Sequence, residues 1–157
     1  MSNNQSIPNA KASRFDSQIF DLLPHRPPML LINKVSELSA TQSSAEVIVD
    51  KEAPFCGENG VPAWVGIEYM GQTAALIAGY QLQQGLAEPH LGFLLGTRRF
   101  QAEVSHFSIG TVLIVSCMEK ALVGDSLATF DCEIREQSSG TLLATASLSV
   151  FRKALDS

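Results

Sequence analysis

Basic charge is scarce in this sequence, and the shortage excludes one large class of partners. The 157 residues include 11 Lys and Arg against 16 Asp and Glu, which gives a formal net charge of −5. The longest basic cluster is Arg98–Arg99, which is too short to form an electrostatic footprint on a nucleic acid. We therefore expect no nucleic-acid partner.

Cysteine is also rare, and chemistry-bearing motifs are few. Cys56, Cys117 and Cys132 are odd in number and far apart, with no CxxC motif and no metal-ligand spacing. This pattern favours reduced thiols in a cytoplasmic protein and predicts no metal. The sequence holds no GxGxxG, Walker or GxSxG motif, so we expect neither a nucleotide cofactor nor a serine hydrolase. No other cofactor is expected.

Long apolar runs are missing as well. Residues 1–10 are polar and lack the apolar core of a signal peptide. The longest apolar stretch is interrupted by Glu68 and Gln72, so it is not expected to span a membrane. The length suits one domain. We predict a polar, flexible arm over residues 1–13 and a single domain over residues 14–153.

One long helix dominates the secondary structure that we predict. From Pro62 to Gln84 the chain is apolar or small and contains no Lys, Arg or Asp. Pro62 suits the first helical position, and Gly85 is a typical stop signal. A helix that is apolar nearly all round is buried inside a fold.

Short extended segments flank this helix. A first helix over Arg14–Leu23 should end at the proline-rich corner that follows it. A polar turn over residues 36–44 and a loop over residues 54–62 separate the elements before the long helix. The strands that we expect span residues 29–35, 45–50, 91–101, 112–121, 126–137 and 141–151. The prediction is an α+β fold in which a curved antiparallel sheet of about five to six strands wraps the long helix.

The helix face around Glu68 is the first candidate site. Trp64 and Gln72 lie within about 40° of Glu68, and Ala75 and Gly79 within about 20°. A carboxyl group that loses hydration among apolar neighbours holds its proton more tightly and suits a general acid. The small residues leave space for a backbone, another helix or an apolar ligand chain. The alternative is that Glu68 faces solvent or a partner subunit.

Two further features are open to a functional or a structural interpretation. The first amides of the helix, after Gly60 and Val61, could hold a thioester carbonyl, or they could belong to an ordinary helix start. His25 lies in the proline-rich corner, where a structural role is favoured. His90 and His106 are expected in surface loops.

Several segments resemble a known family. Residues 23–32, LPHRPPMLLI, resemble the LPHRxPxLLxD segment of the hotdog-fold 3-hydroxyacyl-[acyl-carrier-protein] dehydratases. Residues 66–74, GIEYMGQTA, are similar to that family's LxEAMAQxA helix. Residues 93–100 and the turn at 110–111 resemble the next strand and turn, so the resemblance covers roughly residues 18–152. A subgroup with a GVPAWxGIEYMxQT helix is most similar, and some of its members accompany polyene-type lipid biosynthesis.

The resemblance implies a fold, a mechanism and partners. It implies a hotdog fold and a homodimer or higher homo-oligomer, or a heterodimer with a related dehydratase, with acyl tunnels lined by both chains. The substrate would be an acyl-ACP or acyl-CoA thioester. A histidine would remove the α-proton, and Glu68 would protonate the leaving hydroxyl. Gln72 would orient that carboxylate, while Trp64, Val61 and Gly60 would contact the substrate.

One departure from the family motif leaves three functions open. The family carries its histidine in a GHFPGxPxxPG loop before the helix, but residues 55–62 here are shorter and contain no histidine. His25 is the candidate replacement, and Glu58 and Cys56 are weaker ones. The chain is therefore interpreted as a dehydratase-like enzyme, as a non-catalytic subunit of a heteromeric dehydratase, or as an acyl-thioesterase.

Overall fold

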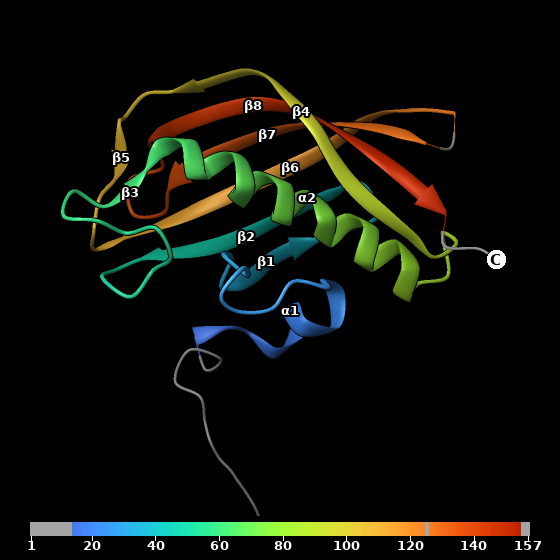
Figure 1. The fold of residues 1–157 in the computed structure, drawn as a ribbon, viewed down its shortest axis with the longest axis horizontal. Helices are drawn as coiled ribbons and strands as arrows, with labels where there is room; N and C mark the ends of the chain where they lie inside the picture. Colours follow the sequence, from blue (N-terminus) through green and yellow to red (C-terminus); the bar gives the residue numbers. More distant parts are fainter. Residues whose placement is uncertain (1–13, 125, 155–157) are drawn as a thin grey trace, which may run out of the picture.

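A long helix lies across one face of a curved six-stranded sheet in residues 14–124 and 126–154, the part of the chain described by this computed structural model (Figure 1). The strands follow the order β1-β2-β6-β7-β8-β4, and every neighbouring pair is antiparallel. Their bounds are Lys34–Leu38 (β1), Gln42–Val49 (β2), His90–Ala102 (β4), Thr111–Val123 (β6), Leu127–Glu136 (β7) and Leu142–Ala154 (β8). The α+β class and the wrapped long helix are confirmed. The arm predicted over residues 1–13 lies outside the described residues.

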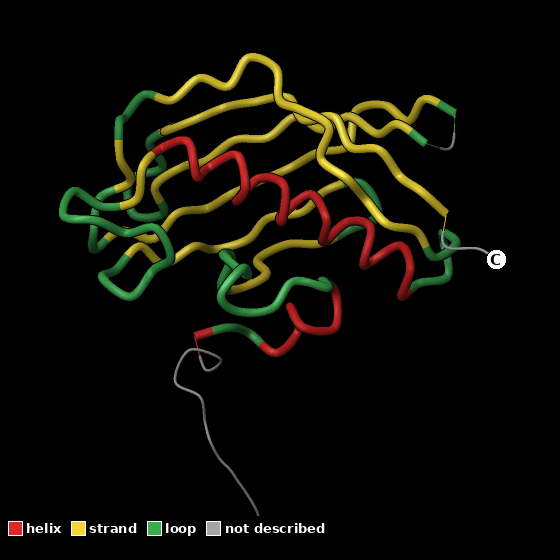
Figure 2. Tube along the Cα trace, viewed as in Figure 1, coloured by secondary structure: helices red, strands yellow, loops and turns green. Residues whose placement is uncertain are grey.

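Alternating side chains fix which face of the sheet meets the helix. On β7, Phe130, Cys132 and Ile134 are buried, while the residues between them are more exposed. Successive residues of a strand point to opposite faces, so this row faces the helix side of the sheet. Tyr69, Met70, Leu76 and Ile77 of the helix belong to the same buried cluster. Figure 2 shows the helices gathered on this one side of the strands.

The long helix begins later than the sequence predicts. Helix α2 spans Gly66–Gln83, after a 3-10 turn, η3, over Ala63–Val65. Pro62 instead lies in the short strand β3 (Val61–Pro62), which pairs with β5 (His106–Phe107). The amide of Ala63 donates to Ser105 O at 2.9 Å, and this bond keeps the segment extended. The predicted start at Pro62 is therefore wrong.

The predicted end of the helix is confirmed. Gly85 has a φ of +70°, a conformation that glycine adopts without strain and that commonly terminates helices. The amide of Leu86 reaches back to Gln81 O at 2.8 Å, and that of Gly85 to Leu82 O at 3.1 Å. Among the described residues, no helix is long and apolar enough to cross a membrane.

A short first helix packs directly on the long one. Helix α1 spans Ser17–Leu22, and the side chain of Asp16 caps it by accepting from the amide of Gln18. A Cβ atom on Gly79 of α2 would lie only 2.2 Å from Leu22 O. The sequence left space beside Gly79 for a backbone, another helix or a ligand chain, and in the structure helix α1 fills it.

Two sequence predictions between α1 and β2 need correction. Residues 30–33 are buried, but the first strand begins only at Lys34, because the amide of Leu31 bonds the side chain of Gln72 rather than a neighbouring strand. The predicted turn over residues 36–44 is too long. β1 and β2 pair as far as Leu38 and Ser43, and the turn between them needs only residues 39–41.

Candidate functional site

Glu68 occupies the first turn of α2 and is exposed in this chain. The partial desolvation expected from its neighbours is therefore not provided by the chain alone. One carboxylate oxygen, Oε2, accepts a hydrogen bond of 3.2 Å from Nε2 of Gln72, one helical turn later. Exposure leaves the rest of the carboxylate open to a ligand or a partner.

Gln72 is the residue of the site that hydrogen bonds to the backbone hold in place. Its side chain is only 1% exposed, and both ends of its amide are used. Oε1 accepts from the amide of Leu31 at 2.8 Å, and Nε2 donates to Met29 O at 2.8 Å. A buried amide with these three contacts ties α2 to the segment that follows the proline-rich corner. The expected role of Gln72 in orienting Glu68 is consistent with this geometry.

His25 lies within electrostatic range of Glu68. Burial lowers the pKa of His25 from its usual value of 6.5, the negative charge of Glu68 partly opposes this, and the neighbouring Arg26 adds to it. Nδ1 of His25 is buried and has no hydrogen-bond partner among the described residues. The imidazole is therefore neutral at neutral pH, which is the form that accepts a proton. The fold places the two residues that the sequence marks as catalytic candidates within electrostatic range of each other.

Gly60 and Val61 shape the entry to the helix. Gly60 has a φ of +104°, and a Cβ atom there would lie 2.0 Å from Phe107 O, so this position requires glycine. Its amide donates to Gly57 O at 3.2 Å. Val61 is fully buried and pairs with Phe107. Their contact with substrate stays a prediction.

An aromatic pair stands beside the first turn of α2. Trp64 is 62% exposed, and Phe55 is 54% exposed. Their rings meet edge to face with centroids 5.9 Å apart. Met29, whose carbonyl bonds Gln72, is also exposed. Phe55 could not be identified from the sequence alone, because a single aromatic residue in a glycine-containing loop carries no periodic signal.

The other candidates lie apart from this cluster. His90 begins β4 and His106 begins β5, so the loop positions expected for them are wrong. Nδ1 of His106 lies 3.1 Å from Ser105 Oγ. Cys56 and Glu58 belong to the segment between β2 and β3. Cys56 is half-buried, and Glu58 is exposed. Within the described ranges, no three His, Cys, Asp or Glu residues cluster as metal ligands.

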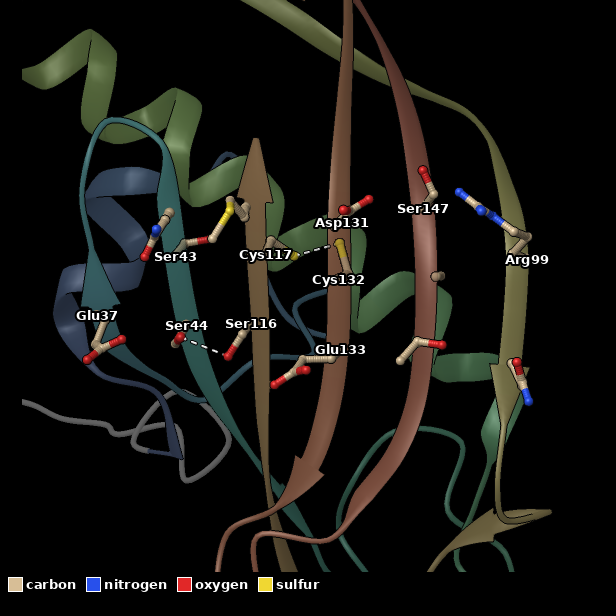
Figure 3. A pocket seen from close by; sticks show the side chains of 15 residues that line it. Glu37, Ser43, Ser44, Arg99, Ser116, Cys117, Asp131, Cys132, Glu133 and Ser147 are labelled. Atoms are coloured by element: carbon tan, nitrogen blue, oxygen red, sulfur yellow. Dashed lines mark hydrogen bonds between the residues drawn. The ribbon is translucent and has the colours of Figure 1, made fainter. Parts of the chain in front are cut away.

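A polar groove of about 720 Å³ lies on the far side of the sheet (Figure 3). Its lining includes Ser116, Met118, Asp131 and Glu133, which alternate along β6 and β7 with the buried Cys117 and Cys132, and these two cysteines also contribute to it. The groove therefore opens away from α2. Glu68, His25 and Gln72 are not among its described lining residues, so it is separate from the candidate site.

Comparison with known proteins first defines the class of fold. A chain of the dehydratase heterocomplex ApeI:P from Xenorhabdus doucetiae is 28% identical, with a TM-score of 0.76, over 87% of this chain and 91% of that one. A hypothetical thioesterase from Streptococcus pneumoniae TIGR4, solved with coenzyme A, is 13% identical, with a TM-score of 0.61, over 79% and 88% of the two chains. The second likeness concerns the fold alone. A helix wrapped by a curved antiparallel sheet, as in these neighbours, is a hotdog fold.

The family follows from the sequence match. A family model described as ApeP-like, ApeP dehydratase, matches residues 17–157, and this chain belongs to that family. The 3-hydroxyacyl-[acyl-carrier-protein] dehydratase FabZ of Roseobacter denitrificans is 35% identical over 46% of this chain. The chain spans about half the length of this curated relative, 52% of it. The predicted resemblance to hotdog-fold dehydratases is confirmed.

Proposed function

We propose that this chain is a subunit of a dehydratase that removes water from a 3-hydroxyacyl thioester carried on ACP or CoA. The observation that carries the proposal is the cluster of Glu68, Gln72 and His25. It combines an exposed carboxylate, a buried amide that holds it, and an imidazole within electrostatic range. Membership of the ApeP-like dehydratase family supports the same reaction class.

The chemistry divides between two groups. Neutral His25 accepts the proton from the carbon next to the thioester carbonyl. Glu68, which takes up a proton when the proposed partner subunit and the acyl chain cover it, donates that proton to the hydroxyl on the next carbon. The C–O bond then breaks, and water leaves with an enoyl thioester behind. His25 then carries the extra proton and Glu68 the negative charge. Transfer of that proton back to Glu68 restores the starting state.

The oligomer is part of the proposal. β4 is an edge strand of the sheet and exposes the apolar side chains of Phe93, Leu94 and Leu95. A long apolar edge left open would pair with other chains. We infer that β4 joins a second hotdog subunit, either a copy of this chain or a related dehydratase. The acyl chain would lie between the two subunits, beside Trp64 and Glu68.

The missing loop histidine favours a second function. The loop before the helix contains no histidine, and the neighbour at 28% identity belongs to a dehydratase heterocomplex. In this alternative the chain is a non-catalytic subunit that completes the acyl tunnel of a partner. That partner would carry the histidine itself. The cytoplasm is the proposed compartment in both cases, since the three cysteines are free thiols.

The deciding experiment measures enoyl formation from 3-hydroxyacyl-ACP and its CoA analogue. The purified chain is assayed alone and with a hotdog dehydratase that carries the loop histidine. Glu68→Gln is compared with Glu52→Gln, which changes an exposed loop carboxylate without a proposed role. The proposal that this chain is itself the enzyme is supported if the chain alone turns over substrate and Glu68→Gln abolishes that turnover while the control variant keeps it.

Other outcomes of this experiment separate the alternatives. Turnover that needs the partner and survives Glu68→Gln supports the non-catalytic subunit. Release of free thiol from acyl-CoA, lost in Glu68→Ala and without enoyl product, would instead indicate a thioesterase. No turnover with or without the partner would refute the dehydratase proposal.

A further inference from the structure

Two of the three cysteines meet beneath the long helix, although fourteen residues separate them in the sequence. Cys117 of β6 and Cys132 of β7 are directly opposite in the antiparallel register. Their Sγ atoms lie 2.9 Å apart, as the dashed line in Figure 3 marks. Both side chains are buried. The proposed function uses neither residue.

The strand register suits a covalent bond between these sulfurs. Directly opposite residues of an antiparallel pair have Cα atoms about 4.5–5.5 Å apart. Native disulfides span Cα distances of about 4.4–6.8 Å. The register therefore places the two cysteines within the range of Cα separations that a disulfide can span.

The surroundings of the two thiols determine how fast they react. Burial raises the pKa of the Cys117 thiol, and the hydrogen bond with Cys132 adds to this. Sγ of Cys117 also lies 3.3 Å from Met70 O on α2, so one S–H proton has two acceptors in reach. Because the thiolate is the reactive form, these thiols are expected to react more slowly with added reagents than the half-buried Cys56.

We propose that Cys117 and Cys132 are a modification site at which a peroxide forms an intramolecular disulfide. The two thiols lose their hydrogens, one S–S bond forms, and hydrogen peroxide takes up two protons and two electrons to become two molecules of water. The bond ties β6 to β7 beneath α2. Cys56 lies on another segment of the described structure and stays outside this disulfide.

The disulfide leaves the candidate site in place. Met70, the α2 residue that Cys117 touches, is buried, whereas Glu68 is exposed, so the two lie on different faces of the helix. Enoyl formation, if present, should then be the same before and after oxidation. The proposal does not depend on the proposed function, because its readout is the covalent state of the cysteines.

The test treats the folded full chain with hydrogen peroxide, alkylates the remaining thiols after unfolding, and maps the peptides by mass spectrometry. The expected result is a linked pair of peptides that contain Cys117 and Cys132, with the peptide of Cys56 outside the link. The link should persist in Cys56→Ser and vanish in Cys132→Ser. The wild-type map alone decides the question if a variant fails to fold.

Three results would overturn the proposal. The first is that Cys117 and Cys132 are both still alkylated in the treated wild-type chain. The second is a disulfide that involves Cys56. The third is a link between two chains rather than within one, detected as a dimer on a non-reducing gel.

Discussion

Gln72 and Glu68 are one turn apart on α2, and Nε2 of Gln72 donates to Oε2 of Glu68 at 3.2 Å. The same nitrogen donates to Met29 O, and Oε1 accepts from the amide of Leu31. The amide is thus held by two backbone groups in addition to Glu68. The carboxylate binds to a fixed group, so its orientation depends on the packing of residues 29–31 against the helix.

Gln72→Ala should destabilise the fold. The substitution leaves the amide of Leu31 and the carbonyl of Met29 without their partner, at a cost of about 1–3 kcal/mol each. We expect the free energy of unfolding to fall by about 2–4 kcal/mol in urea denaturation. Gln83→Ala is the matched control, because Gln83 is exposed on the same helix and its side chain donates to Asp21 O at 3.2 Å. Equal losses in both variants would refute the anchoring role of Gln72.

The titration of His25 should respond to Glu68. NMR should give His25 a pKa below 6.5, since burial disfavours the charged imidazole. The charge of Glu68 raises the pKa of His25, so Glu68→Gln should lower it further. His106→Gln removes the ring signal of His106 and so helps to assign the signal of His25. A pKa of 6.5 or more would contradict the dominant effect of burial, and no change in Glu68→Gln would show that the two residues are not coupled.

The lowered pKa of His25 should make the free energy of unfolding depend on pH. Because the folded-state pKa of His25 is lowered, the unfolded chain binds more protons over the range just below 6.5. The contribution of neutral His25 to stability is therefore complete above pH 6.5 and declines as the pH falls toward the folded-state pKa. The difference in unfolding free energy between the wild type and His25→Gln should shrink or reverse in acid. A difference that grows in acid would contradict this sign.

Replacing either of two glycines of α2 by alanine should change the free energy of unfolding in opposite directions. At Gly79 the new Cβ would meet Leu22 O at 2.2 Å, so α1 must move, at a cost of about 1–3 kcal/mol. At Gly71 the nearest atom is Cδ2 of Leu94 at 3.9 Å, an ordinary contact. Gly71→Ala should then stabilise the helix by about 0.5–1 kcal/mol. Urea denaturation measures both, and similar effects would mean that α1 is not packed closely on Gly79.

A charge on the free edge of the sheet should prevent subunit association. Leu95 of β4 is 62% exposed, and Leu95→Lys would place an ammonium group on the edge proposed as the interface. Light scattering after size exclusion should show the wild type as a dimer and the variant as a monomer. Val123→Lys is the control, since Val123 is exposed near the end of β6, three strands from β4. A monomeric wild type would refute the interface for a homodimer.

Local patterns explain which elements were predictable. A long run without Lys, Arg or Asp predicts a buried helix, and Gly85 predicts its end, because both signals act within a few residues. The start was misplaced because Pro62 satisfies a local rule, whereas its strand conformation depends on pairing with His106, far along the chain. The meeting of Cys117 with Cys132 was missed for the same reason, since it depends on the register of β6 and β7.

The sequence by itself determined the helix, the resemblance to hotdog dehydratases, and the pairing of Glu68 with Gln72, because a spacing of four residues puts two side chains on one helix face. Only the tertiary structure decided that His25 lies near Glu68 and that Glu68 is exposed rather than desolvated in this chain. The physical reason is the buried amide of Gln72. Its bonds to Met29 and Leu31 fix the segment after the proline-rich corner against α2, and no local pattern specifies that contact.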